Sequence, residues 1–144
     1  MATILTSIHE GPVPVIALDS PHDCGAECIF VGRTRGEIHA QHGALLRLEY
    51  EMYEPMSAKL LQEMAEEAVT RWGCGIVRIV HAKGAVALGE ASVVIQVVTP
   101  HRVASFEACR HLIEKLKQEL PVWKREIWDR GQTFVEGWSV KRSV

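Results

Sequence analysis

The sequence predicts an α+β fold in which two main helices pack on a mainly antiparallel sheet. Three observations predict it. Two long runs carry apolar side chains at helical spacing, the other apolar runs are short and rich in β-branched residues, and no repeat, linker or low-complexity segment divides the chain. Because 144 residues is the length of one ordinary domain, we expect residues 1–144 to form a single domain.

The first third of the chain predicts strands separated by turns. Residues 12–18, PVPVIAL, form a short apolar run before a segment rich in turn-forming residues. Residues 27–36 predict a buried strand that runs into a basic loop ending at a glycine. Residues 45–53 alternate between apolar and charged side chains, which predicts a half-exposed strand with Leu46, Leu48 and Tyr50 on the same face.

Residues 54–75 predict the first helix, because apolar side chains recur there every three or four residues and charged residues take the positions between them. Pro55 suits the first turn of a helix, and Gly73 suits the residue that follows its end. The β-branched runs 76–82 and 91–99 come next, and both predict strands.

Residues 104–120 predict the second helix. At about 100° per residue, Lys117 lies on the edge of its apolar stripe, whereas Lys115 points to solvent. Residues 121–138 then predict a short strand, a turn at 129–131 and a closing strand. The two lysines of this helix are therefore expected to differ in environment.

Composition excludes several classes of function. A formal net charge of −2 argues against a nucleic-acid partner, so any anion site must be local. No run approaches the roughly 18 apolar residues of a membrane span, and no leader pattern begins the chain, so we expect a cytoplasmic protein without a membrane partner. The four cysteines lack CxxC spacing, which predicts reduced thiols.

Metal and cofactor motifs are absent from the sequence. His22, Cys24 and Cys28 are close in sequence, but their spacing matches no standard zinc pattern, and small buried cysteines are common. There is also no glycine-rich phosphate loop, Ser-His-Asp arrangement or HExxH motif. We therefore expect neither a metal nor a resident cofactor.

Cations gather after two of the predicted strands. Arg33 and Arg35 follow one strand, and His101 and Arg102 follow another, at positions where small domains commonly build binding sites. Each taken alone is more often a solvated surface cation, and His101 is equally a residue that satisfies loop backbone. Together with the lysines near the second helix, they predict a cradle for a phosphate.

Two lysines are candidates for chemistry. Lys117 is expected to be partly desolvated and close to other cations, and both effects lower the pKa of a lysine and make it a better base or nucleophile. The alternative is a lysine whose stem covers the edge of the core while its ammonium stays in water. Lys124 follows Trp123. The indoles of Trp123 and Trp128 can stack on a planar heterocycle, but buried packing beside the helix is more frequent for such residues.

Several segments, in this order along the chain, resemble the MoaE family, the large catalytic subunits of molybdopterin synthase. They are FVGRTRG (30–36), LEYEMYEPM (48–56), RW (71–72), VIQVVTPHRVASFEA (94–108), LKQELPVWKRE (116–126) and GQTFVEG (131–137). The resemblance departs from the family pattern at residues 81–84, HAKG, and at Phe134, where tryptophan is frequent.

The resemblance implies an α/β hammerhead fold with a small additional antiparallel sheet. It also implies a sulfurtransferase that moves sulfur from the C-terminal Gly-Gly thiocarboxylate of a small ubiquitin-like carrier subunit to cyclic pyranopterin monophosphate. The product is the dithiolene of molybdopterin, in molybdenum cofactor biosynthesis. The implied assembly is a homodimer that forms a heterotetramer with two small subunits.

The resemblance also assigns roles residue by residue. Lys117 and Lys124 match active-site lysines, the first as a general acid/base or transient nucleophile. Part of the pocket is expected across the homodimer interface. The residues implied to hold or line the substrate are Arg33, Thr34, Arg35, His101, Arg102, Arg125 and Glu126.

Two other readings of the sequence remain open. A non-enzymatic module that binds a phosphorylated ligand would need the arginines and His101 but would be indifferent to Lys117. A purely structural subunit would need no site. Complex formation with a small protein ending in Gly-Gly, and sulfur transfer once that terminus is thiocarboxylated, distinguishes the enzyme from both.

Overall fold

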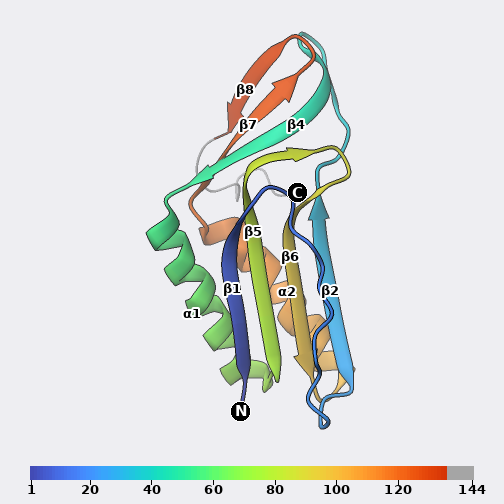
Figure 1. Ribbon diagram of the computed structural model, residues 1–144, viewed down its shortest axis with the longest axis vertical. Helices are drawn as coiled ribbons and strands as arrows, with labels where there is room; N and C mark the ends of the chain where they lie inside the picture. Colours follow the sequence, from blue (N-terminus) through green and yellow to red (C-terminus); the bar gives the residue numbers. More distant parts are fainter. Residues whose placement is uncertain (136–144) are drawn as a thin grey trace.

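The computed structural model describes residues 1–135 and has the predicted α+β architecture (Figure 1). Eight strands form one sheet, and two long helices cover part of it. In chain order the elements are β1 (Thr3–Glu10), β2 (Ala26–Arg33), β3 (Ile38–His39), β4 (Gly43–Met52), α1 (Glu54–Trp72), β5 (Ile76–Ala87), β6 (Ala91–Thr99), α2 (Arg102–Glu119), β7 (Val122–Trp128) and β8 (Gly131–Val135).

The sheet has two parts that share β5. In the first, which we call the lower sheet, the strand order is β1-β5-β6-β2, with only β1 and β5 parallel. In the second, the upper sheet, β4, β7 and β8 are antiparallel neighbours and β3 pairs with β4. β5 pairs with β6 over Ile76–His81 and with β4 over Gly84–Ala87. The upper sheet is the expected additional sheet, and β5 runs from one part into the other (Figure 1).

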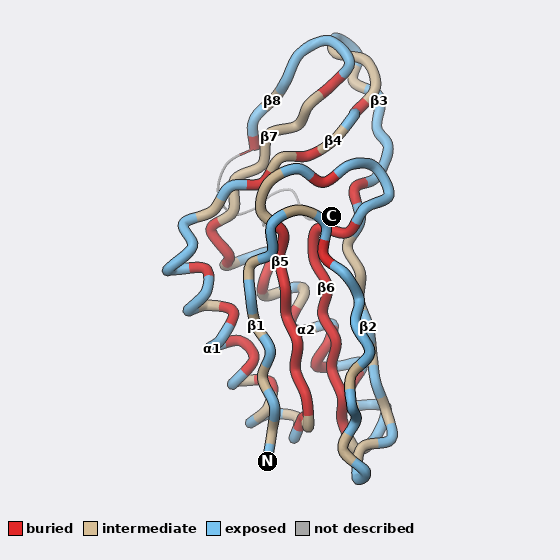
Figure 2. Tube along the Cα trace, in the orientation of Figure 1, coloured by how far each residue is buried: buried red, intermediate tan, exposed pale blue. Residues whose placement is uncertain are grey.

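The helices α1 and α2 pack on one face of the lower sheet and enclose the main core. Their apolar stripes meet the helix-facing side chains of β5 and β6, and Leu61, Leu112 and Ile95 at this contact are fully buried. Every residue of β6 is buried, because segment 11–25 crosses the opposite face (Figures 1 and 2). Burying both faces of β6 explains its unbroken apolar sequence.

The segment 12–18 is not a strand, contrary to the prediction. Pro12 and Pro14 have no backbone N–H to donate, so this run cannot form the regular hydrogen bonds between neighbouring strands. It crosses the sheet instead, held where the Arg78 guanidinium donates to the Pro14 carbonyl at 2.9 Å and where the Gln96 amide donates to the Ile16 carbonyl at 2.8 Å. The first strand is β1, which was not predicted.

The predicted face of Leu46 is also wrong. The register of β4 against β7 shifts between Leu45 and Arg47, which indicates a bulge. Leu45 is therefore the buried residue, at 2% exposure, and Leu46 is 44% exposed. Beyond the bulge the alternation resumes, and Leu48 and Tyr50 face the core as expected.

The other predicted elements are confirmed with shifted ends. The predicted first helix is α1, the second helix begins two residues earlier than expected, and β5 extends well past residue 82. The closing strand is present as β8, while the last two residues of GQTFVEG lie outside the described residues. Across residues 1–135, no helix is both long enough and apolar enough to span a membrane.

Candidate active site

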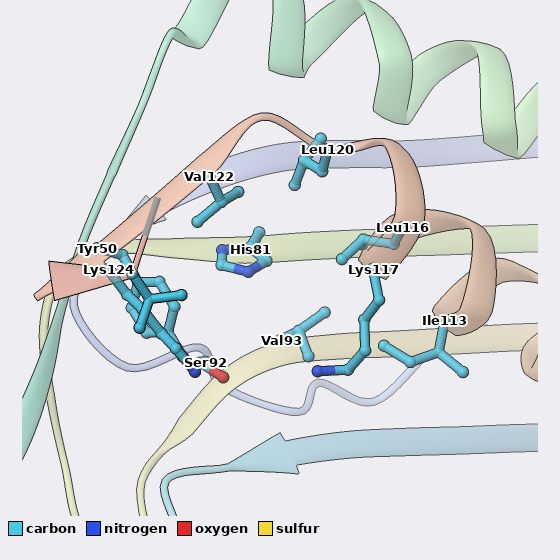
Figure 3. A pocket seen from close by; sticks show the side chains of 11 residues that line it. Tyr50, His81, Ser92, Val93, Ile113, Leu116, Lys117, Leu120, Val122 and Lys124 are labelled. Carbon is cyan, nitrogen blue, oxygen red and sulfur yellow. The ribbon is translucent and has the colours of Figure 1, made fainter. Parts of the chain in front are cut away.

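A pocket opens where α2 ends, beside the junction of the lower and upper sheets (Figure 3). Its walls are mainly aliphatic, and its polar groups come from five different elements. The lining residues are Tyr50 of β4, His81 of β5, Ser92 and Val93 of β6, Ile113, Leu116 and Lys117 of α2, Leu120 after it, Val122 and Lys124 of β7, and Val135 of β8.

Lys117 reaches the pocket from the last turn of α2. Its neighbours Leu116 and Leu120 are buried in the core, and this places Lys117 on the edge of the apolar stripe, as the helical spacing predicts. Lys117 is exposed as a whole residue, yet it lines the pocket, and its ammonium lies beside Val93 and Ile113 (Figure 3). Desolvation, and secondly the positive charge of Lys124, lower the pKa of Lys117.

Lys124 enters the pocket from the opposite wall. It lies on β7 directly across from Tyr50 of β4, so the two side chains share one face of the upper sheet. Arg125, the next residue, points to the other face, where its guanidinium donates to Glu49 at 3.3 Å. The structure thus brings Lys117 and Lys124 together and places Arg125 outside this pocket.

Replacing Lys124 with Gln should raise the pKa of Lys117. The Lys124 ammonium disfavours the charged form of Lys117, so its removal makes protonation easier while the amide keeps a similar volume. The pKa of Lys117 is measured by NMR titration of lysine side chains labelled with carbon-13. Lys115→Gln is the control, because Lys115 is paired with Glu67 at 2.9 Å. An unchanged Lys117 pKa in Lys124→Gln would show that the two ammonium groups do not interact.

Sequence reasoning did not identify three polar residues of the pocket, namely Tyr50, His81 and Ser92. His81 is 6% exposed, its Nδ1 lies 2.8 Å from the Ala82 carbonyl oxygen, and its ring packs edge-on against Tyr50 at 5.2 Å between centroids. Burial, opposed by that backbone hydrogen bond and assisted by the Lys117 charge, lowers the pKa of His81 to about 4. His81 is therefore a neutral imidazole at pH 7.

Tyr50 and Ser92 are linked to the surrounding strands. Burial raises the pKa of Tyr50, a hydrogen bond with Ser92 opposes that effect, and the Glu126 carboxylate adds to it. The Ser92 hydroxyl also donates to the Gly32 carbonyl at 3.3 Å. Glu126 accepts a hydrogen bond from the Thr133 hydroxyl at 2.7 Å. The hydroxyl groups of Tyr50 and Ser92 therefore both stay protonated and uncharged at neutral pH.

The predicted residues after β2 lie at the same end of the lower sheet as the pocket but do not line it in this chain. Arg33 is exposed and donates to the Gly89 carbonyl at 2.8 Å. Thr34 is buried and pairs with Leu88 in an isolated bridge. Arg35, directly after it, is exposed.

His101 and Arg102 lie at the opposite end of α2 from Lys117. His101 is the N-cap of the helix, Arg102 is its first residue, and both are exposed. Fifteen residues separate Arg102 from Lys117, a distance of about 22 Å along the helix axis. Within one chain these residues therefore do not join the two pocket lysines. Val103 and Phe106, on the same first turns of α2, are each 62% exposed.

Gly32 lacks a side chain, and this leaves room for the side chain of Val93 in the pocket wall. A Cβ at this position would lie 2.6 Å from Cγ1 of Val93, which lines the pocket. Gly32→Ala should therefore lower the free energy of unfolding by about 1–3 kcal/mol, measured by urea denaturation. Adding Val93→Ala should recover part of this loss, because it removes the clashing methyl group. If the double variant instead lost as much free energy of unfolding as the two single variants added together, the clash would be contradicted.

Thiols and metal ligands do not contribute to this pocket. The four cysteines are free, and none lines it. Burial raises the pKa of Cys74 to about 11 and of Cys109 to about 12, so both are protonated thiols at neutral pH. Within the described part of the chain, no three His, Cys, Asp or Glu side chains gather in a way that would hold a metal ion.

Comparison with known proteins shows a family match. The model of the family described as MoaE protein matches residues 10–119. The chain is 39% identical over 113 residues to the molybdopterin synthase catalytic subunit of Bacillus subtilis, covering 78% of this chain and 71% of that protein. It is 43% identical over 110 residues to the molybdopterin synthase catalytic subunit of Culex quinquefasciatus, covering 76% and 69%.

Solved structures have the same fold. Molybdopterin synthase from Staphylococcus aureus superposes with a TM-score of 0.76 at 30% identity, covering 93% of this chain and 96% of that chain. A chain from the complex of subunits 1 and 2 of the molybdopterin-converting factor of Helicobacter pylori superposes with a TM-score of 0.70 at 20% identity, covering 90% and 89%. The Helicobacter pylori likeness supports the fold alone.

Proposed function

Because this chain belongs to the MoaE family, we propose that it is the catalytic subunit of a molybdopterin synthase. In this role it transfers sulfur from the thiocarboxylated C-terminus of a small ubiquitin-like subunit to cyclic pyranopterin monophosphate, and the product is the dithiolene of molybdopterin. The chain's relatives carry the name catalytic subunit, which favours the enzyme over a ligand-binding module or a structural subunit. Four free cysteines fit a reducing compartment, so we place the activity in the cytoplasm.

The pocket lined by Lys117 and Lys124 is the observation that carries the proposal. Its aliphatic walls suit an extended Gly-Gly tail, which has no side chains, and its two ammonium groups suit the anionic thiocarboxylate at the end of that tail. No carboxylate is among the residues of 1–135 that line it. Holding the carrier tail and the pterin together in this space accelerates their reaction, because the two reacting groups are already close and oriented.

Lys117 is proposed to exchange protons during the reaction. The carrier sulfur bonds to a carbon of the pterin substrate while a carbon–oxygen bond at that carbon breaks and the oxygen leaves with a proton. Water then cleaves the acyl–sulfur bond, so that the sulfur stays on the pterin and the carrier leaves as a carboxylate. Each step moves a proton, and a group titrating closer to neutral pH than an ordinary lysine exchanges it more readily. The lowered pKa of Lys117 fits this requirement. Lys124, on the facing wall, is proposed to hold the thiocarboxylate.

A second copy of the chain is proposed to complete the site. His101 and Arg102 are too far along α2 to reach the pocket of their own chain, yet both are exposed beside Val103 and Phe106, which offer an apolar contact. In a two-fold dimer each chain can therefore supply these cations to its partner's pocket. Arg35, and more peripherally Arg33, Thr34, Arg125 and Glu126, are proposed to border the same substrate. Two small subunits on such a dimer give a heterotetramer.

The test of this function is reconstitution. The chain is mixed with a small carrier protein ending in Gly-Gly, either as the thiocarboxylate or as the ordinary carboxylate, together with cyclic pyranopterin monophosphate. Mass spectrometry should detect the dithiolene product only with the thiocarboxylated carrier, and size-exclusion chromatography should show a complex with both forms. Complex formation without any product from the thiocarboxylate would contradict the proposed function.

A further inference from the structure

The polar side chains of the pocket fall into two sets (Figure 3). The Lys117 ammonium lies beside aliphatic side chains of β6 and α2, whereas Tyr50 and Lys124 both point toward Ser92. Tyr50 and Lys124 are cross-strand partners on β4 and β7, so their side chains leave the same face of the upper sheet. The second set, which we call the hydroxyl end of the pocket, therefore combines the hydroxyl groups of Tyr50 and Ser92 with the ammonium of Lys124.

The Tyr50 ring is held in one position by its neighbours. Tyr50 is 9% exposed and belongs to the apolar cluster that includes Leu48 and Val86. Its ring also packs edge-on against His81, at 5.2 Å between centroids and an interplanar angle of 82°. A side chain that is already ordered loses little further conformational entropy when it binds a ligand. The Tyr50 hydroxyl is therefore preorganised at the pocket.

The Ser92 hydroxyl determines the role of the Tyr50 hydroxyl. Ser92 has one hydroxyl proton, which it donates to the Gly32 carbonyl at 3.3 Å. Ser92 is then the acceptor in the hydrogen bond that it shares with Tyr50, and Tyr50 is the donor. A phenolic proton can rotate about its C–O bond toward another acceptor. Because burial raises the pKa of Tyr50, that proton is present at neutral pH.

A thiocarboxylate ends in two different atoms, one oxygen and one sulfur. For the carrier to react, the sulfur must face the pterin. Oxygen is a good hydrogen-bond acceptor and sulfur is a weak one, so a hydroxyl donor at a fixed position selects the oxygen. An ammonium on a flexible stem attracts the group as a point charge and distinguishes the two atoms less well. The hydroxyl end thus offers both attraction and direction.

We propose that Tyr50 orients the carrier tail, because its hydroxyl donates to the thiocarboxylate oxygen and leaves the sulfur facing the Lys117 side of the pocket. The inference rests on the proposed function and deepens it at the same site. Lys124 balances the charge of the thiocarboxylate, and Tyr50 fixes its rotation. Such alignment of a reacting atom increases the rate of the step that follows binding.

The experiment compares Tyr50→Phe with Tyr53→Phe in the reconstituted system. Tyr50→Phe keeps the ring and removes the hydroxyl, so we expect the single-turnover rate at saturating carrier to fall about 10- to 100-fold. The carrier Kd should rise by at most about 10-fold, as measured by isothermal titration calorimetry with the ordinary carboxylate. Tyr53→Phe is the matched control, because Tyr53 is 61% exposed before α1 and does not line the pocket. It should keep the wild-type rate.

A second measurement detects the contact without any sulfur transfer. Tyr50 and Tyr53 are the two tyrosines of the sequence, so a chain labelled with 3-fluorotyrosine gives two fluorine-19 NMR signals, which Tyr53→Phe assigns. The Tyr50 signal should shift when a carrier ending in a Gly-Gly carboxylate binds. It should not shift when the bound carrier lacks its last two residues.

Two results would overturn the proposal. They are a wild-type single-turnover rate in Tyr50→Phe, and a Tyr50 fluorine signal that stays unchanged when the complete carrier binds. The second needs no substitution of Tyr50, so it decides the matter even if Tyr50→Phe fails to fold. A wild-type chain that binds the thiocarboxylated carrier without forming product would instead refute sulfur transfer, and the fluorine signal would still report whether the carrier terminus reaches Tyr50.

Discussion

Lys117→Ala should abolish dithiolene formation while the chain still folds and still binds its carrier. Removing a group that exchanges protons in the reaction typically costs about 100- to 10,000-fold in rate. The substitution removes a desolvated ammonium that faces a second cation, so we expect the free energy of unfolding to change by less than about 1 kcal/mol. Product formation under single turnover and urea denaturation measure the two effects separately.

Two further variants identify the cause of the loss of activity in Lys117→Ala. Lys115→Ala lies two residues earlier on α2, where the side chain pairs with Glu67 outside the pocket, and it should retain full activity. Lys117→Arg keeps a positive charge but cannot release its proton near neutral pH, so it should remain inactive. Full activity in Lys117→Ala would refute the proposed role of Lys117 in proton exchange. Full activity in Lys117→Arg would show that Lys117 contributes only its positive charge.

Variants on two different chains should complement each other. Alone, Lys117→Ala and Arg102→Ala should each be inactive, because every pocket of the homodimer lacks one group. In a mixed dimer, one pocket receives Lys117 from one chain and Arg102 from the other, and it is intact. After subunit exchange, random mixing should restore about a quarter of the wild-type activity.

The control for complementation is the double variant Lys117→Ala/Arg102→Ala mixed with wild-type chains. In its mixed dimers each pocket lacks one of the two groups, so the mixture should show only the activity of the remaining wild-type dimers. If Arg102 acted within its own chain, the two single variants would gain nothing on mixing, which the length of α2 between Arg102 and Lys117 argues against.

Helical and strand periodicity predicted the position of those side chains whose direction depends only on their own helix or strand. The position of Lys117 on the edge of the stripe follows from 3.6 residues per turn alone. The separation of His101 and Arg102 from Lys117 along the same helix was equally readable, since all three lie on one continuous run. The prediction placed part of the pocket across a homodimer interface, so the separation of Arg102 and Lys117 within one chain leaves the convergence of these cations a prediction about the dimer.

Other features depend on contacts that periodicity does not contain. The bulge that exposes Leu46 arises where β4 meets β7, and nothing within residues 45–53 marks it. Segment 12–18 is apolar because it covers the buried faces of β5 and β6, not because it extends a sheet. His81 had a usable signal, since it interrupts the apolar alternation of Val77 and Ile79 at a buried position.

β5 is a shared strand, and this has a mechanical consequence. Lys117 is anchored to the lower sheet through α2, whereas Lys124 belongs to the upper sheet, and β5 crosses from one to the other between His81 and Gly84. The gap between the two ammonium groups therefore depends on the twist of this short crossing. A few degrees of rotation there would change the width of the pocket entrance, and β1 would have to follow, because it pairs with β5 through Ala82 and Lys83.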